Sequence, residues 1–359
     1  LEPIRPTNWK SLLKVWIIKD LHKGIFSKGR LDLINLKQII VLIQLKTVDK
    51  DPRTMTTAHL EVLAARGVTR LSLGIQDFDP KVQRAIRRIQ PFELVQNLVK
   101  EIRSTGIKSI NFDLIYGLPH QSRTSLQRTL EQVAELAPDR IALFKFAYLP
   151  NHLKWQRTLP KEAMPSALDA MKLFVHATRR LTADGYKFIG LDHFVKPEDS
   201  LYQAFEQGIL KRSFQGMTTT NLPVIGFGPT AISSIPSAYS QNASKVQDWL
   251  RAVTHGHFAL QKGYRLSTQD RKIRATLNSL YCYGVVDFSG LNRALTSAEK
   301  VRYFEQLKSD GLVTVEQGQL TLTEFGKLMV RVVAPLFDES LPLAFWQQQT
   351  SFSQQYSAV

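Results

Sequence analysis

The chain has 359 residues, a length that predicts about two domains, and 43% of its residues are hydrophobic, which excludes a disordered or low-complexity protein. A formal net charge of +16 fits a nucleic acid, an anionic small molecule or an anionic surface as partner, without choosing among them. One cysteine, Cys282, excludes an internal disulfide and any metal or cluster site built from several cysteines of this chain.

The first fifty residues differ in composition from the rest of the chain. Residues 1–50 contain no alanine, whereas residues 51–359 contain 25. The longest aliphatic run, 39–43, is far too short to cross a bilayer, so we expect no membrane partner. We expect 1–50 to be an atypical segment. Two explanations stay open: a shifted reading frame, truncated gene or wrong start, or a real lineage with a different N-terminal region.

Between residues 56 and 194 the sequence alternates between helix and strand patterns. Alternating apolar residues predict strands over 70–76, 108–115, 140–147 and 187–194. Capping residues and glycine stops predict helices over 56–67, 79–90, 91–106, 122–136 and 165–183. Four strands separated by helices predict parallel pairing, which brings the carboxyl ends of the strands to one edge of the sheet. Ser72, Gly74 and Gln76 alternate with bulky residues, and this favours a partial barrel whose lumen holds a ligand.

The pattern changes after residue 265. Two helices are expected over 267–280 and 297–309, then two short strands around a turn at 317–319, then a helix over 324–333. This order is typical of a winged-helix-like module. We therefore predict an α/β protein with a partial barrel over 51–265, a mainly helical C-terminal domain over 266–340 and a loose tail over 341–359.

Five motifs carry a resemblance to a known family. They are Gly74-Ile-Gln-Asp-Phe78, Asp113-Leu-Ile-Tyr-Gly-Leu-Pro119, Gly190-Leu-Asp-His-Phe194, Phe214-Gln-Gly-Met-Thr-Thr219 and Gly226-Phe-Gly-Pro-Thr-Ala-Ile-Ser233. In order and spacing they resemble the oxygen-independent coproporphyrinogen III oxidase family, a radical S-adenosylmethionine (radical SAM) family, over residues 51–337. The His-Asn-x-x-Tyr-Trp string of the related haem chaperones is not found in this chain, which favours the oxidase branch.

The resemblance implies a partial (β/α)6 radical SAM barrel with a helical C-terminal domain. It implies an oxidoreductase of haem biosynthesis, coproporphyrinogen dehydrogenase, which converts coproporphyrinogen III to protoporphyrinogen IX by SAM-dependent oxidative decarboxylation. The implied cofactors are S-adenosylmethionine and a 4Fe-4S cluster. We expect coproporphyrinogen III as the substrate, no nucleic acid partner, a monomer and a cytoplasmic location.

Five residues match positions to which the resemblance gives a role, and two more are candidates for substrate contacts. Matches to SAM contacts are Gln76, Arg88, Asp113 and Ala147, for a second SAM, and Ile232, for a first, cluster-bound SAM; weaker substrate candidates are His193 and Gln215. Taken from the residues alone, Arg88 is a solvated helix residue and Asp113 a capping acid. His193 is as readily a structural histidine, and we expect Cys282 to be a buried core thiol. No catalytic residue is identified.

The chain departs from the family pattern near its beginning. The Cys-x-x-x-Cys-x-x-Cys string that holds the cluster and the Gly-Gly-Gly-Thr-Pro loop are both missing from this sequence. Where the family has Glu-x-Asp-Pro, this chain has Asp49-Lys-Asp-Pro52. Because three thiolates must ligate the cluster, we expect no metal site and no reductive cleavage of SAM by this chain alone. We also expect the edge of the barrel sheet to be left unpaired.

Two other functions remain open. The first is a non-catalytic protein that binds a tetrapyrrole or SAM. The second is a nucleic-acid module, suggested by the net charge and the winged outline. The second is weakened because the expected helix over 324–333 is largely apolar, whereas a recognition helix exposes polar side chains.

Overall fold

The computed structural model describes residues 47–341, except 152, 214–215, 220–222, 227 and 340, together with 345–346. The contacts between residues divide these into two compact units, one holding 47–55, 69–210 and 273 onward, the other 56–68 and 211–272. Most of the atypical segment, most of the tail and Gln215 lie outside the described residues. The domain boundaries drawn above therefore stay predictions. No described helix is long and apolar enough to cross a membrane.

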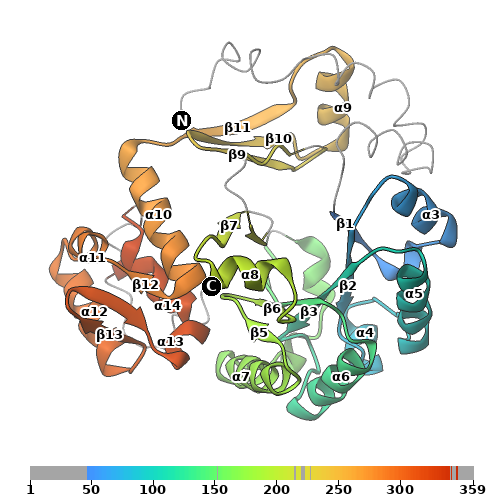
Figure 1. Cartoon of the computed structure of the whole chain (residues 1–359), viewed down its shortest axis with the longest axis horizontal. Coiled ribbons are helices and arrows are strands. Elements are labelled where there is room, and N and C mark those ends of the chain that lie inside the picture. The colour runs from blue at the N-terminus through green and yellow to red at the C-terminus, as the bar shows by residue number, and fades with distance from the viewer. Residues whose placement is uncertain are drawn as a thin grey trace. The chain divides into compact units, whose positions relative to one another are not determined.

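The first unit is built on a six-stranded sheet with the strand order β1-β2-β3-β4-β6-β5 (Figure 1). The strands are β1 (Thr47–Lys50), β2 (Arg70–Gln76), β3 (Ser109–Tyr116), β4 (Arg140–Lys145), β5 (Lys187–Phe188) and β6 (His193–Val195). The pairs from β1 to β4 are parallel. The strand β1, from the end of the atypical segment, pairs along the first four residues of β2. Among the described strands β1 is itself an end strand of the sheet, so the expected unpaired edge stays a prediction.

Helices connect these strands (Figure 1). They are α4 (Pro80–Ala85), α5 (Phe92–Ser104), α6 (Arg123–Leu136), α7 (Ala167–Ala183) and α8 (Ser200–Glu206), with three short 3-10 turns, η2 (Pro52–Thr54), η3 (Lys154–Thr158) and η4 (Lys161–Ala163). The helices α4, α5, α6 and α7 lie along the outer side of the sheet (Figure 1). Ser122 and Ser166 cap α6 and α7, as expected for serine before an apolar helix. The sheet presents Leu73, Phe112 and Leu143 to these helices with no exposed surface, which forms the main core.

The predicted fourth parallel strand, 187–194, was wrong. Instead, β5 and β6 form a hairpin in which β6 runs antiparallel to both β4 and β5. Gly190 and Leu191 both have a positive φ, of 105° and 52°, which reverses the chain in the middle of the expected strand. The predicted helix over 79–90 also ends early, at Ala85, because Arg87 takes a left-handed conformation with φ 55°.

The C-terminal part of the same unit matches the expected helix and wing order with three additions. Its elements are α10 (Thr268–Tyr283), β12 (Val285–Val286), α11 (Phe288–Ala294), α12 (Ala298–Ser309), β13 (Val313–Glu316), β14 (Gln319–Leu322), α13 (Glu324–Leu328), α14 (Val330–Val333) and η5 (Ala334–Phe337). The additions are β12, α11 and η5, and β12 adds a third member to the wing. The last predicted helix is broken at Met329, between α13 and α14.

The second unit holds smaller elements, of which only the first helix was predicted. They are α3 (Thr57–Ala65), β7 (Lys211–Ser213), β8 (Gly216–Thr218), β9 (Ile232–Ile235), β10 (Ala238–Asn242), α9 (Val246–Thr254) and β11 (Leu260–Arg265). The strands β9, β10 and β11 form an antiparallel sheet, and β7 pairs with β8.

Candidate functional site

Polar side chains gather on the face of the main sheet that α5, α6 and α7 do not cover, which we call the inner face. Because side chains alternate along a strand, the inner face receives Ser72 and Gly74 from β2 while Leu71 and Leu73 enter the core. The register places Gly74 beside Asp113, Asp113 beside Ala142, and Ala142 beside His193. Asp113 and His193 therefore lie in one row across β2, β3, β4 and β6, and Gln76 lies two residues beyond Gly74 on β2. These three candidates come from separate motifs.

Asp113 is the most constrained of these side chains. Its carboxylate accepts hydrogen bonds from Ser72 Oγ at 3.0 Å and from Asn111 Nδ2 at 2.8 Å, and Asn111 also donates to Ser72 Oγ at 2.9 Å. Burial raises the pKa of Asp113 to about 6. The hydrogen bond from Ser72 opposes this rise, and the negative charge of Asp49 adds to it. An acid held in this way can accept from ligand hydroxyls once it is ionised.

Arg88 and Gln76 lie over Gly74, next to Asp113. The strand bulges after Gly74, and Gln76 has a φ of 67°. A Cβ atom on Gly74 would lie 2.8 Å from Gln76 Nε2 and 3.1 Å from an Arg88 terminal nitrogen, so a larger residue there would push these two side chain ends aside. The guanidinium donates to Gly74 O at 2.8 Å and pairs with Asp51 at 3.1 Å. Burial lowers the pKa of Arg88, and the charge of Asp51 opposes that effect.

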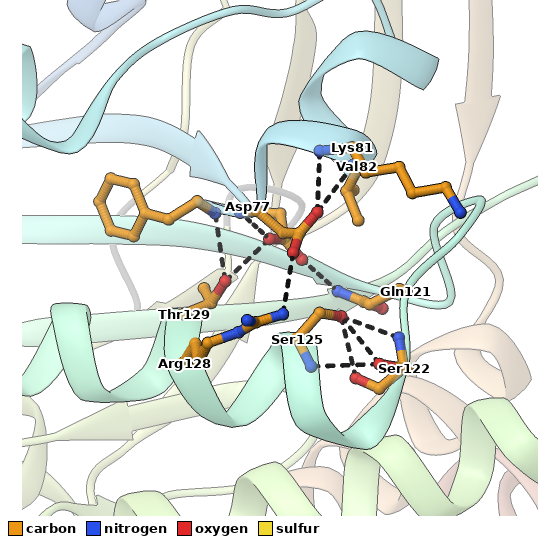
Figure 2. A network of polar contacts seen from close by, with 10 residues as sticks. Asp77, Lys81, Val82, Gln121, Ser122, Ser125, Arg128 and Thr129 are labelled. Carbon is orange, nitrogen blue, oxygen red and sulfur yellow. Dashed lines mark hydrogen bonds and ion pairs between the residues drawn. The ribbon is translucent and has the colours of Figure 1, made fainter.

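A second polar network holds the chain as it leaves β2 (Figure 2). The fully buried carboxylate of Asp77 accepts from the backbone of Asp79 at 2.6 Å, from Gln121 Nε2 at 2.6 Å and from Thr129 Oγ1 at 2.8 Å. Burial raises the pKa of Asp77, and these hydrogen bonds oppose that effect. Asp79 in turn caps α4 through the backbone of Lys81. The motif residue Asp77 thus has a structural role, tying β2 to α6 and to the turn after β3.

The remaining candidates have different surroundings. Ala147 follows β4 and is exposed, and its carbonyl accepts from Gln156 Nε2 at 2.9 Å. His193 is half-buried at the start of β6, with the ring of Phe144 edge-on at 6.3 Å. Ile232 begins β9 in the second unit, where its backbone closely approaches Gly226. The structure thus brings Gln76, Arg88 and Asp113 together in one unit, and Ile232 belongs to the other.

Basic groups lie near the carboxyl end of β4. Arg331 of α14 makes a bidentate ion pair with the nearly fully buried Asp192, at 2.7 Å and 2.5 Å. Burial lowers the pKa of Lys145, and the charge of Arg331 lowers it further, so the two cations are close. Lys145 and Arg331 thus bring two positive charges to this region, beside the carboxylate of Asp192.

The residues of the chain do not fit a 4Fe-4S cluster, which needs three thiolates. Cys282 is the one cysteine of the sequence, and it lies buried in α10, where its Sγ contacts Asn278 Oδ1 at 3.7 Å. Among the described residues, no group of three or more His, Cys, Asp or Glu side chains could hold a metal ion. The expectation that Cys282 is a buried thiol is confirmed.

Sequence reasoning missed the side chains that support these candidates. Gln83 and Gln90 are buried and bind the backbone around Gly74 and Asp77. Their one signal in the sequence is that two long amides occur in a stretch predicted as a helix, 79–90. Asn111 was visible only as a polar residue within an apolar strand.

Comparison with known proteins gives the family of the chain. The family model described as the Radical SAM superfamily matches residues 28–133, so the match begins within the segment of unusual composition. The oxygen-independent coproporphyrinogen III oxidase of Pseudomonas aeruginosa is 36% identical over 302 residues, which cover 82% of this chain and 66% of the relative. That of Helicobacter pylori (strain 26695) is 37% identical over 298 residues. The chain thus spans about two thirds of the length of these relatives.

Two further matches cover more of the related protein. The oxidase of Thermostichus vulcanus is 36% identical over 77% of this chain and 87% of its own length. The solved structure of coproporphyrinogen III oxidase from Escherichia coli, a radical SAM enzyme, superposes with a TM-score of 0.81 at 30% identity, over 95% of this chain and 86% of that one. The predicted fold class is confirmed. The chain belongs to the oxygen-independent coproporphyrinogen III oxidase family of radical SAM proteins.

Proposed function

We propose that this chain binds S-adenosylmethionine and coproporphyrinogen III, as a member of its family, and that it does not by itself cleave SAM reductively. The observation that carries the proposal is the inner face around Gly74, where an acid and a guanidinium converge at the carboxyl ends of parallel strands. Ligands of such sheets bind at that edge. The homologous proteins named above act on coproporphyrinogen III.

The chemistry of SAM matches the groups around Gly74. Asp113, once ionised, accepts from the ribose hydroxyls, and Gln76 can donate or accept beside it. The two contacts of Arg88 use one hydrogen on each terminal nitrogen, so the other hydrogens are available to the carboxylate of the ligand. SAM, when bound, supplies a sulfonium whose cleavage gives the adenosyl radical of this superfamily. Radical SAM proteins in general use SAM together with a 4Fe-4S cluster.

The tetrapyrrole carries four carboxylates, and these need cations or hydrogen-bond donors near the site. We propose that the positive charges of Lys145 and Arg331 attract them and that His193 and Gln215 donate to them. Gln215 lies outside the described residues, so its role rests on the motif alone. Three expectations remain predictions: that the protein has no nucleic acid partner, that it is a monomer and that it is cytoplasmic.

No step of the radical reaction is assigned to this chain, because it offers one thiolate where three are needed. The test is anaerobic reconstitution with iron and sulfide, followed by an assay for 5′-deoxyadenosine. We expect none above background from this chain, with the Pseudomonas aeruginosa oxidase as positive control. Turnover comparable to that control would overturn the proposal. Absorbance titration with coproporphyrin III tests the tetrapyrrole separately, and lack of saturable binding would contradict that part.

A further inference from the structure

Two buried glutamines, Gln83 and Gln90, lie behind the candidate site and take no part in the function as proposed. Gln90 is fully buried, and its Nε2 donates to Gly74 O at 3.2 Å and to Ile75 O at 2.6 Å. Both hydrogens of the amide are therefore used. The reversed amide would place its oxygen against two carbonyl oxygens, so the orientation is fixed.

Gln83 closes the turn that carries Arg88 onto Gln90. Its Nε2 donates to Gln90 O at 2.9 Å and to Asp77 O at 3.0 Å, and its Oε1 accepts from Gln90 N at 3.0 Å. The carbonyl of Gln83 also accepts from the backbone of Arg88 at 2.9 Å. Arg87, within this turn, has the left-handed φ of 55° that ends α4. A left-handed residue within a turn is energetically unfavourable, so the hydrogen bonds of Gln83 are needed to keep the turn in this conformation.

We infer that Gln90, held by Gln83, is a positioning residue that fixes Arg88 over Gly74 for the carboxylate of the ligand. The geometry that supports this is the shared acceptor, since Gln90 and Arg88 both donate to Gly74 O. Among the described residues, Arg88 Nε is buried without a hydrogen-bond partner, so its own contacts fix the guanidinium only at its far end. The inference rests on the proposed binding of SAM.

The test compares two ligands and two buried glutamines. S-adenosylmethionine carries the amino-carboxylate, whereas 5′-methylthioadenosine keeps the adenosine without it. Gln121→Met is the matched control, because Gln121 is also buried and donates to a strand carbonyl, Ile115 O, at 2.9 Å, and to Asp77. Affinities are measured by isothermal titration calorimetry at constant pH, and folding is checked by thermal unfolding.

We expect Gln90→Met to weaken SAM binding about tenfold or more and methylthioadenosine binding by less than about threefold. Gln121→Met should affect the two ligands equally. In the Arg88→Met background, Gln90→Met should add no further loss of SAM affinity, because the two residues act as a unit. Equal weakening of both ligands by Gln90→Met, or additive losses with Arg88→Met, would overturn the inference.

A ligand-free measurement separates this inference from the proposed function. If the wild-type protein binds neither ligand, the proposed function fails. The positioning role is then tested by the NMR signal of the Arg88 Nε proton. This signal is assigned by its absence from the spectrum of Arg88→Met. A fixed, buried guanidinium predicts a sharp, slowly exchanging signal that is lost in Gln90→Met and kept in Gln121→Met. A signal unchanged in Gln90→Met would overturn the positioning role whatever the ligand does.

Discussion

Replacing Asp113 by asparagine tests whether the site lowers the stability of the fold. In the unfolded chain this carboxyl ionises near pH 3.8, whereas burial raises its pKa to about 6 in the folded protein. The folded state therefore binds the proton more tightly, and its stability falls as the pH rises from about 4 to about 6. At 1.36 kcal/mol per pKa unit the difference is about 3 kcal/mol, which we reduce to about 1–2 because solvent reaches this partly exposed group.

The Asp113→Asn variant removes the charge and keeps the shape. Its oxygen can still accept from Asn111, and its amide can donate to Ser72 Oγ. We expect the variant to be more stable than the wild type by about 1–2 kcal/mol at pH 7.5 and equal to it at pH 4. Urea unfolding followed by circular dichroism measures both differences. SAM affinity at pH 7.5 should fall about tenfold or more, since the charged acceptor is lost.

The control is Asp77→Asn, which should do the opposite. Burial raises the pKa of Asp77 too, but both of its carboxylate oxygens accept from donors, so the nitrogen of the new amide would face Gln121 Nε2, or Asp79 N and Thr129 Oγ1. We expect this variant to lose about 1–3 kcal/mol of unfolding free energy at pH 7.5. The reasoning is refuted if Asp113→Asn is no more stable than the wild type at pH 7.5, or if it binds SAM with unchanged affinity.

The other predictions concern packing, charge and backbone conformation. Gly74→Ala should displace Arg88 and weaken SAM binding about tenfold or more, as measured by calorimetry, and unchanged affinity would contradict the close contact. Arg331→Met leaves the buried carboxylate of Asp192 uncompensated and should cost about 3–5 kcal/mol in chemical denaturation, so a loss below about 1 kcal/mol would show that the pair is solvated. Ala137→Gly, at a helix end with φ 45°, should raise the unfolding free energy by about 0.5–1 kcal/mol, and a decrease would argue against the left-handed conformation.

Local signals predicted the parallel part of the fold well and its irregular parts poorly. Asp79 and Ser122 marked true helix starts, because a capping side chain acts on its own turn. The hairpin of β5 and β6 was missed because Leu191, an ordinary strand residue, takes a left-handed φ that no local pattern in the sequence predicts. The short strands between residues 211 and 265 carry too few alternating residues to be recognised from periodicity.

The sequence predicted the candidate residues that face the ligand, but not the buried side chains that hold them in place. Gln76 and Asp113 end or lie within strands of clear alternation, so parallel pairing alone brings them to one edge. Arg88 was identified only through the family resemblance, since an arginine within a predicted helix is usually solvated. Gln90 could not have been assigned from sequence, because its contacts depend on a turn whose conformation no local pattern specifies.

The most direct test of the account is to identify the ligand that the intact chain retains. The protein, reconstituted anaerobically with iron and sulfide in the presence of a reductant, is equilibrated with radiolabelled SAM, separated from free ligand and analysed by chromatography. The account predicts that intact SAM is recovered in near one-to-one amount from the wild type and is lost from Asp113→Asn. Recovery of 5′-deoxyadenosine, or no retained ligand at all, would contradict it.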